Sequence, residues 1–219
     1  MKNPTQLIKH CGIAMAATFL FCTSAYANII AITGNIQWIL PPASVVTNSG
    51  LENNKTAFLF KEQMSYLLGG NALVNISTPG FYNSNGSLSG GAVPAGTTID
   101  SYYYHADPVG NASTNNQSYS GTITFDTDVL GIDVLDGGLS ATNFLGFFGT
   151  LYSNSGQGFE LGGPDTITLS ADRRTITVFN LANSAADDFR VITAVPEPAS
   201  IALLFLGLTG LALSMRKKS

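Results

Sequence analysis

Residues 165–178 read Asp-Thr-Ile-Thr-Leu-Ser-Ala-Asp-Arg-Arg-Thr-Ile-Thr-Val. On either side of the polar connection Ser170–Arg173, threonine alternates with isoleucine, leucine or valine. This period of two residues is that of a β-strand with one buried face, because successive side chains point to opposite sides. Two such runs joined by a short turn predict a hairpin of Asp165–Leu169 and Arg174–Val178, with its aliphatic face in the core and its threonines in water.

The same alternation recurs earlier in the chain. Gly121–Asp126 reads Gly-Thr-Ile-Thr-Phe-Asp, which places Ile123 and Phe125 on one face of a strand. Further strands are predicted at Ile29–Ile32, Ile36–Leu40, Ala57–Phe60, Ala72–Ile76, Thr97–Tyr104, Val129–Leu135 and Phe189–Thr193.

Clusters of Gly, Asn, Ser and Pro separate these runs, and the best candidate for a short helix is Lys61–Leu68. Frequent turn residues between short strands favour one all-β domain over residues 28–194, with a β-sandwich or jelly-roll-like architecture. The polar segments Ser77–Ala95 and Pro108–Ser118 are either flexible connections or binding loops.

The N-terminal 27 residues have the three parts of a signal peptide. Lys2 and Lys9 precede an apolar run from Gly12 to Cys22, and small residues follow, with Ala25 and Ala27 at the positions that signal peptidase requires. About 11 apolar residues make a helix near 16 Å long, too short for a permanent membrane span. We therefore predict a signal helix that signal peptidase removes after Ala27, so that Asn28 begins the mature chain.

The C-terminal segment, residues 195–219, also has three parts. Pro196, Glu197 and Pro198 precede an apolar run, Ile201–Met215, which is followed by Arg216, Lys217 and Lys218. Basic residues just past an apolar helix stay in the cytoplasm, so the preceding domain lies outside. The predicted transmembrane helix is only about 22 Å long, which suits a temporary anchor. A simple C-terminal anchor is the alternative.

The charge and cysteine content of residues 28–194 exclude several functions. This part holds five basic and thirteen acidic side chains, a net charge of about −8. Such a domain repels phosphate backbones, so no nucleic-acid partner is expected. Both cysteines, Cys11 and Cys22, lie in the predicted signal peptide, so we expect neither a disulfide nor thiolate chemistry in the mature domain.

No catalytic constellation is apparent in residues 28–194. His105 is the only histidine there, with Asp107 two residues on, and no Gly-x-Ser-x-Gly motif supplies a nucleophile. A structural histidine near the end of a strand is the better interpretation, and no enzymatic activity is expected. One histidine without cysteines also excludes a structural zinc site.

Four aspartates, Asp126, Asp128, Asp133 and Asp136, form the densest acidic cluster. The first two fit the opening of a calcium loop, but Leu130 stands where a third oxygen ligand belongs and no Glu closes the loop. No cofactor is expected, with weak Ca²⁺ binding at the rim of the sandwich as the open alternative.

Aromatic residues offer one candidate glycan site. Tyr102 and Tyr104 share one side of their predicted strand, and with Trp38 they could form a platform on which a sugar ring stacks. The competing interpretation, which we favour, is that these tyrosines are packed in the core.

The C-terminal segment carries a specific resemblance. Pro196-Glu197-Pro198, the short apolar helix and the basic trio resemble the PEP-CTERM sorting signal of Gram-negative bacteria, although family tails are often richer in arginine. In that family a membrane-embedded exosortase recognises and processes the tail. The resemblance implies a transient inner-membrane anchor, followed by delivery to the cell surface or extracellular matrix.

The resemblance extends into the middle of the chain. Several phrases occur in the order typical of a recurring β-rich domain of PEP-CTERM exported proteins, namely Phe60–Gln63, Pro94–Thr97, Ser101–Pro108, Gly121–Asp126, Phe159–Glu160 and Asp187–Thr193. That domain has no firmly assigned activity, so the resemblance implies a fold and a location but no particular chemistry. We expect a structural or adhesive component associated with exopolysaccharide or biofilm. The alternative is a carbohydrate-binding, lectin-like module, and a secreted hydrolase ranks third.

Overall fold

The computed structural model describes residues 28–48, 50–110, 117–159, 161–183 and 185–195. All of them belong to the compact unit that runs from Tyr26 to Val195. The predicted cleavage residues Ala25 and Ala27 lie outside the described residues, as does the sorting signal with Pro196, Glu197, Pro198 and the basic trio Arg216, Lys217 and Lys218. No helix within the described ranges is long and apolar enough to span a membrane. The helix predicted at Ile201–Met215 falls outside those ranges.

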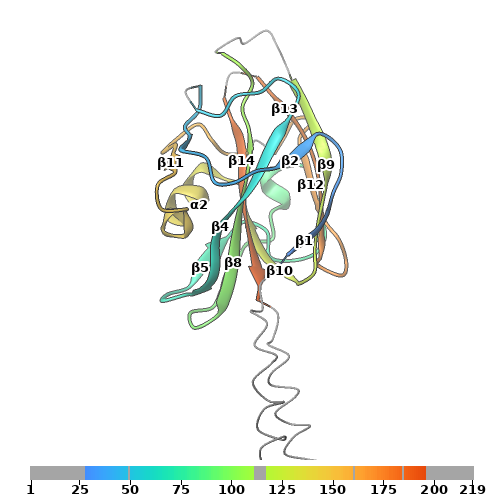
Figure 1. Ribbon diagram of the computed structural model, residues 1–219. Helices are drawn as coiled ribbons and strands as arrows, with labels where there is room; N and C mark the ends of the chain where they lie inside the picture. Colours follow the sequence, from blue (N-terminus) through green and yellow to red (C-terminus); the bar gives the residue numbers. More distant parts are fainter. Residues whose placement is uncertain (1–27, 49, 111–116, 160, 184, 196–219) are drawn as a thin grey trace, which may run out of the picture. The chain divides into compact units, whose positions relative to one another are not determined.

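Two five-stranded sheets make up most of the domain (Figure 1). The first is antiparallel throughout, in the order β1 (Ile29–Ile32), β9 (Gln117–Phe125), β13 (Thr175–Ala182), β12 (Thr166–Leu169) and β6 (Gly80–Tyr82). The second has the order β10 (Val129–Asp133), β14 (Asp187–Ala194), β8 (Thr98–Ala106), β4 (Ala57–Leu67) and β2 (Ile36–Trp38). Its pairs are antiparallel except for β2 with β4.

Smaller elements complete the described part. Two short pairs form, β3 (Ser44–Val45) with β11 (Leu151–Tyr152), and β5 (Ala72–Val74) with β7 (Gly91–Val93). The helical turns are η1 (Asn85–Ser87), α2 (Asp136–Ala141) and η2 (Asn143–Leu145).

One hydrophobic core lies between the two large sheets. It combines Ile123 and Phe125 of the first sheet with Leu59, Tyr104 and Phe189 of the second. Because side chains alternate along a strand, each sheet turns one apolar face to the other. The all-β prediction is confirmed, and the sheets pack face to face.

The hairpin at 165–178 forms as predicted. β12 and β13 are antiparallel, with Ile167 opposite Val178 and Leu169 opposite Ile176, and all four side chains are buried. Arg173 takes a φ of 59° in the turn. The alternation of the sequence therefore specifies both the strand pair and the face that it buries.

The short helix predicted at Lys61–Leu68 is wrong. This segment continues β4 to Leu67 and pairs with β8, with two interruptions of the register between Lys61 and Tyr66. Local propensity is a weak prior here, since ladder hydrogen bonds to a neighbouring strand override it. The polar segment 77–95 is also more structured than its composition suggests, because it contains β6, η1 and β7.

Candidate functional site

The centre of the second sheet carries many of the buried polar groups. From Ile99 to Ala106 every residue of β8 is buried, and so is every residue of β14 from Asp187 to Thr193. Alternate side chains of β8 therefore point to two covered faces. One is the core between the large sheets, and the other lies under the outer cluster of Val45, Phe60, Tyr103 and Leu139.

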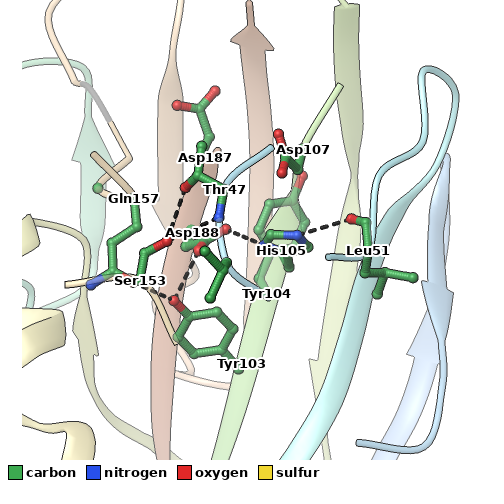
Figure 2. A network of polar contacts seen from close by, with 12 residues as sticks. Thr47, Leu51, Tyr103, Tyr104, His105, Asp107, Ser153, Gln157, Asp187 and Asp188 are labelled. Carbon is green, nitrogen blue, oxygen red and sulfur yellow. Dashed lines mark hydrogen bonds and ion pairs between the residues drawn. The ribbon is translucent and has the colours of Figure 1, made fainter. Parts of the chain in front are cut away.

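His105 is the centre of a buried hydrogen-bond network (Figure 2). Its Nδ1 lies 2.8 Å from Asp188 Oδ1, and its Nε2 lies 3.0 Å from the carbonyl oxygen of Leu51. The Tyr103 hydroxyl lies 2.9 Å from Asp188 Oδ2 and 3.2 Å from Gln157 Oε1. Because both ring nitrogens face oxygen atoms, the protonated imidazolium satisfies this site best. The network therefore connects the segments that contain Leu51 and Gln157 to strands β8 and β14.

The neighbouring Asp107 forms hydrogen bonds with the segment that contains Leu51. The backbone N–H of Asn48 donates to Asp107 Oδ2 at 2.8 Å, and the N–H of Asn53 donates to the Asp107 carbonyl at 2.8 Å. The other carboxyl oxygen, Oδ1, is buried without a hydrogen bond. Burial raises the pKa of Asp107 to about 6. The hydrogen bond from the Asn48 N–H favours the charged carboxylate and so opposes this shift.

Burial would lower the pKa of His105, but the Asp188 carboxylate and its hydrogen bond outweigh this effect and raise the pKa above 6.5. Burial also raises the pKa of Asp188 above 3.8, and His105 opposes that shift. Asp133, under α2, behaves like Asp107, with burial raising its pKa to about 6.

These shifts predict a domain that is more stable in mild acid. Asp107 and Asp133 bind protons more tightly when folded, so stability rises as the pH falls from about 6 toward 4. The contribution of His105⁺ is present below its unfolded pKa and is lost as the pH rises through its raised folded pKa. We expect the free energy of unfolding by urea to be larger at pH 5 than at pH 8, by on the order of 1–2 kcal/mol per carboxyl group. Asp107→Asn should flatten this dependence, and stability that increases with pH would contradict the assignment.

A second polar cluster lies on the same outer face of β14. The Arg190 guanidinium donates to both carboxyl oxygens of Glu62, at 2.7 and 2.9 Å, and Ser101 Oγ donates to Glu62 Oε2 at 2.7 Å. Arg190 Nη1 also donates to the Leu139 carbonyl and to Thr142 Oγ1, at 3.0 and 2.6 Å. The buried ion pair therefore fixes α2 against the sheet.

The structure places Tyr102 and Tyr104 in the core rather than on a sugar-binding face. Neither ring has exposed surface. Tyr104 stacks on Phe189 with 4.3 Å between ring centroids, and its hydroxyl donates to Asn180 Oδ1 at 2.8 Å. The burial of both rings favours packing in the core over glycan contact for these two residues.

The four clustered aspartates have separate partners. Asp126 accepts from Asn28, Asp128 lies 3.5 Å from Arg174 Nε, and Asp133 accepts from Thr142. Asp136 accepts from the backbone N–H groups of residues 156, 157 and 158. Within the described ranges, no three His, Cys, Asp or Glu side chains come together as metal ligands do.

A groove of about 410 Å³ lies along β1. Residues 28–32 line it together with Trp38, Lys61 and Tyr102. The Trp38 side chain is 44% exposed, whereas Lys61 Nζ is held 2.9 Å from the buried Asp100 Oδ2. Trp38 was a candidate from its residue type. Lys61 was not, because only the pairing of β4 with β8 places it opposite Tyr102.

Comparison with known proteins concerns the C-terminal end. The PEP-CTERM protein-sorting motif matches residues 194–218, the segment with Pro-Glu-Pro, the apolar run and the basic residues. A search among curated proteins finds no match, and a search among solved structures finds none either. The motif implies an exported protein that is anchored transiently and processed by an exosortase. The chain therefore carries a PEP-CTERM protein-sorting motif at residues 194–218.

Proposed function

We propose that the domain of residues 28–194 is a non-enzymatic, structural or adhesive component of the extracellular matrix, in contact with exopolysaccharide. Export and exosortase processing follow from the sorting motif at 194–218. In this proposal signal peptidase removes residues 1–27, and the processed protein reaches the surface or matrix of a Gram-negative bacterium.

The observation that carries the adhesive role is a set of exposed apolar side chains within residues 144–151. The Phe148 side chain is 97% exposed, and Phe144, Phe147 and Leu151 are also exposed large hydrophobic residues. Exposed apolar side chains gathered in one place mark interaction sites more often than scattered ones do. Aromatic faces also stack on the apolar faces of pyranose rings, which makes a matrix polysaccharide a fitting partner.

Neighbouring segments hold this exposed loop in place. The Leu151 N–H donates to the Ala43 carbonyl at 3.0 Å, and Gln63 Nε2 donates to the Gly146 carbonyl at 2.9 Å. The Phe147 N–H donates to the Tyr152 hydroxyl at 2.9 Å. A loop that is already ordered loses less conformational entropy on binding, which supports its use as a contact surface.

The groove at Trp38 supports the alternative function, a carbohydrate-binding module. It combines the partly exposed Trp38 of β2 with the polar groups of Asn28, next to β1, and of Lys61, on β4. In that alternative, one sugar unit stacks on Trp38 and the loop 144–151 contributes little.

Replacing Phe147 and Phe148 together should separate these functions. We expect Phe147→Ser with Phe148→Ser to lower the fraction of exported protein retained in the pelleted matrix about tenfold, since each aromatic contact contributes on the order of 1 kcal/mol. The melting temperature should stay the same. Phe81→Ser, at another exposed phenylalanine, is the matched control. Unchanged retention would refute the adhesive role, and loss of binding to isolated polysaccharide only in Trp38→Ala would favour the alternative.

A further inference from the structure

The first described residue, Asn28, is held by one carboxylate. Its backbone nitrogen lies 2.8 Å from Asp126 Oδ1, and its side-chain Nδ2 lies 3.3 Å from Asp126 Oδ2. In the other direction, the Asp126 N–H donates to the Asn28 carbonyl at 3.0 Å. Both oxygens of Asp126 therefore face the residue at which we expect the mature chain to begin.

Strand pairing determines this contact. β1 is an edge strand, and its Ile29 is opposite Phe125 of β9, so Asn28 and Asp126 are the next pair along the two strands. Asn28 is exposed, and its nitrogen lies at the end of the strand. The pairing of β1 with β9 thus places Asp126 beside Asn28, in addition to the hydrogen bonds that the Asp126 carboxylate itself accepts.

Among the described residues, the basic side chains of this region form ion pairs with carboxylates other than Asp126. Arg174 pairs with Asp128, and Lys61 pairs with Asp100. In the part of the chain that the structure describes, no Lys, Arg or His forms an ion pair with Asp126. Burial raises the pKa of Tyr102, and the negative charge of Asp126 adds to this effect.

Hydrolysis of the Ala27–Asn28 bond changes the chemistry of the Asn28 nitrogen. Water adds across the bond, which leaves a carboxylate on Ala27 and an amine on Asn28. This α-amine has an ordinary pKa of about 7.7–8.0, so at neutral pH most of it is an ammonium group. A neutral amide donor becomes a cation on the same atom, next to a carboxylate that is already in place.

We propose that Asp126 is a built-in acceptor for the new N-terminus, so that removal of the signal peptide converts the Asn28–Asp126 hydrogen bond into a salt bridge. The salt bridge fastens the edge strand β1 to β9 in the exported form only. The inference rests on export through the signal peptide, as the proposed function does, but not on the adhesive role. Its contribution to stability is present while the amine is protonated and is lost as the pH rises through the amine's raised pKa.

The test uses the processed protein recovered from cells that express the complete chain. Mass spectrometry of the N-terminal peptide first establishes whether it begins at Asn28, and the rate of acylation of its α-amine by acetic anhydride is then measured between pH 6 and 9. Since only the neutral amine reacts, we expect acylation at pH 7 to be about three- to fivefold slower than in Asp126→Asn. The matched control Asp128→Asn, two residues away, should react as slowly as the natural protein.

A second measurement shows whether the pair contributes to stability. Acetylation of the α-amine should lower the melting temperature of the natural protein and leave that of Asp126→Asn unchanged, because the latter has already lost the pair. A mature chain that begins elsewhere than at Asn28, or equal acylation rates in the natural protein and Asp126→Asn, would overturn the proposal. Neither result depends on retention in the matrix, which tests the proposed function separately.

Discussion

Replacing Arg190 with methionine is expected to destabilise the domain by about 3–5 kcal/mol, the usual cost of removing one partner of a buried ion pair. The substitution leaves the Glu62 carboxylate buried with the Ser101 hydroxyl as its remaining donor among the hydrogen bonds described above. It also removes the donors to the Leu139 carbonyl and Thr142. Urea unfolding of the exported protein, followed by circular dichroism, measures the effect directly.

Two further variants make this prediction specific. Arg174→Met removes an exposed ion pair, and we expect it to cost about 0.5 kcal/mol or less. Adding Glu62→Leu to Arg190→Met removes the stranded charge and should recover part of the loss. An Arg190→Met protein as stable as Arg174→Met would show that the buried pair does not hold α2 and β14 together.

Tyr104→Ala is expected to cost about 3–5 kcal/mol, because it removes a buried ring and leaves a cavity in the core. It also removes the stacking contact with Phe189 and the hydrogen bond to Asn180. For a domain of this size, the loss corresponds to a melting temperature lower by roughly 10 °C. Thermal unfolding followed by circular dichroism is the measurement.

Two controls separate the contribution of the buried Tyr104 ring from that of its hydroxyl group and from the effect of removing an exposed aromatic ring. Tyr104→Phe keeps the ring and should cost about 1 kcal/mol for the lost hydrogen bond. Phe148→Ala removes an exposed ring and should leave the melting temperature nearly unchanged. A stable Tyr104→Ala protein that loses glycan binding would return Tyr104 to the role of a sugar contact.

Sequence periodicity predicted the strands well where it is strictly alternating. The runs at 121–126 and 165–178 become parts of β9, β12 and β13, and the residues predicted to face the core do so. The segment Lys61–Leu68 lacks that alternation, so its pairing with β8 was not predictable from the segment itself. Such pairing depends on residues about 40 positions away in the chain.

The polar clusters illustrate the same limit. The sequence indicated that His105 is a structural histidine near the end of a strand, but its partner Asp188 is 83 residues away. The ion pair of Arg190 with Glu62 joins residues 128 positions apart. Charge and spacing in the sequence do not identify such partners, because the register of β8 with its two neighbours decides which side chains meet.

The sequence by itself determined the all-β class, the hairpin at 165–178 and the sorting motif at 194–218, since each rests on a local pattern. Only the tertiary structure decided whether the tyrosines of β8 are buried or exposed. A strand with alternating sides tells which residues share a face, but not whether that face is covered. Here the core covers one side, and the outer cluster with Val45 and Leu139 covers the other. Because β8 is covered on both sides, Tyr102, Tyr104 and His105 have no exposed surface, whereas Trp38 and Phe148, which lie outside β8, are exposed.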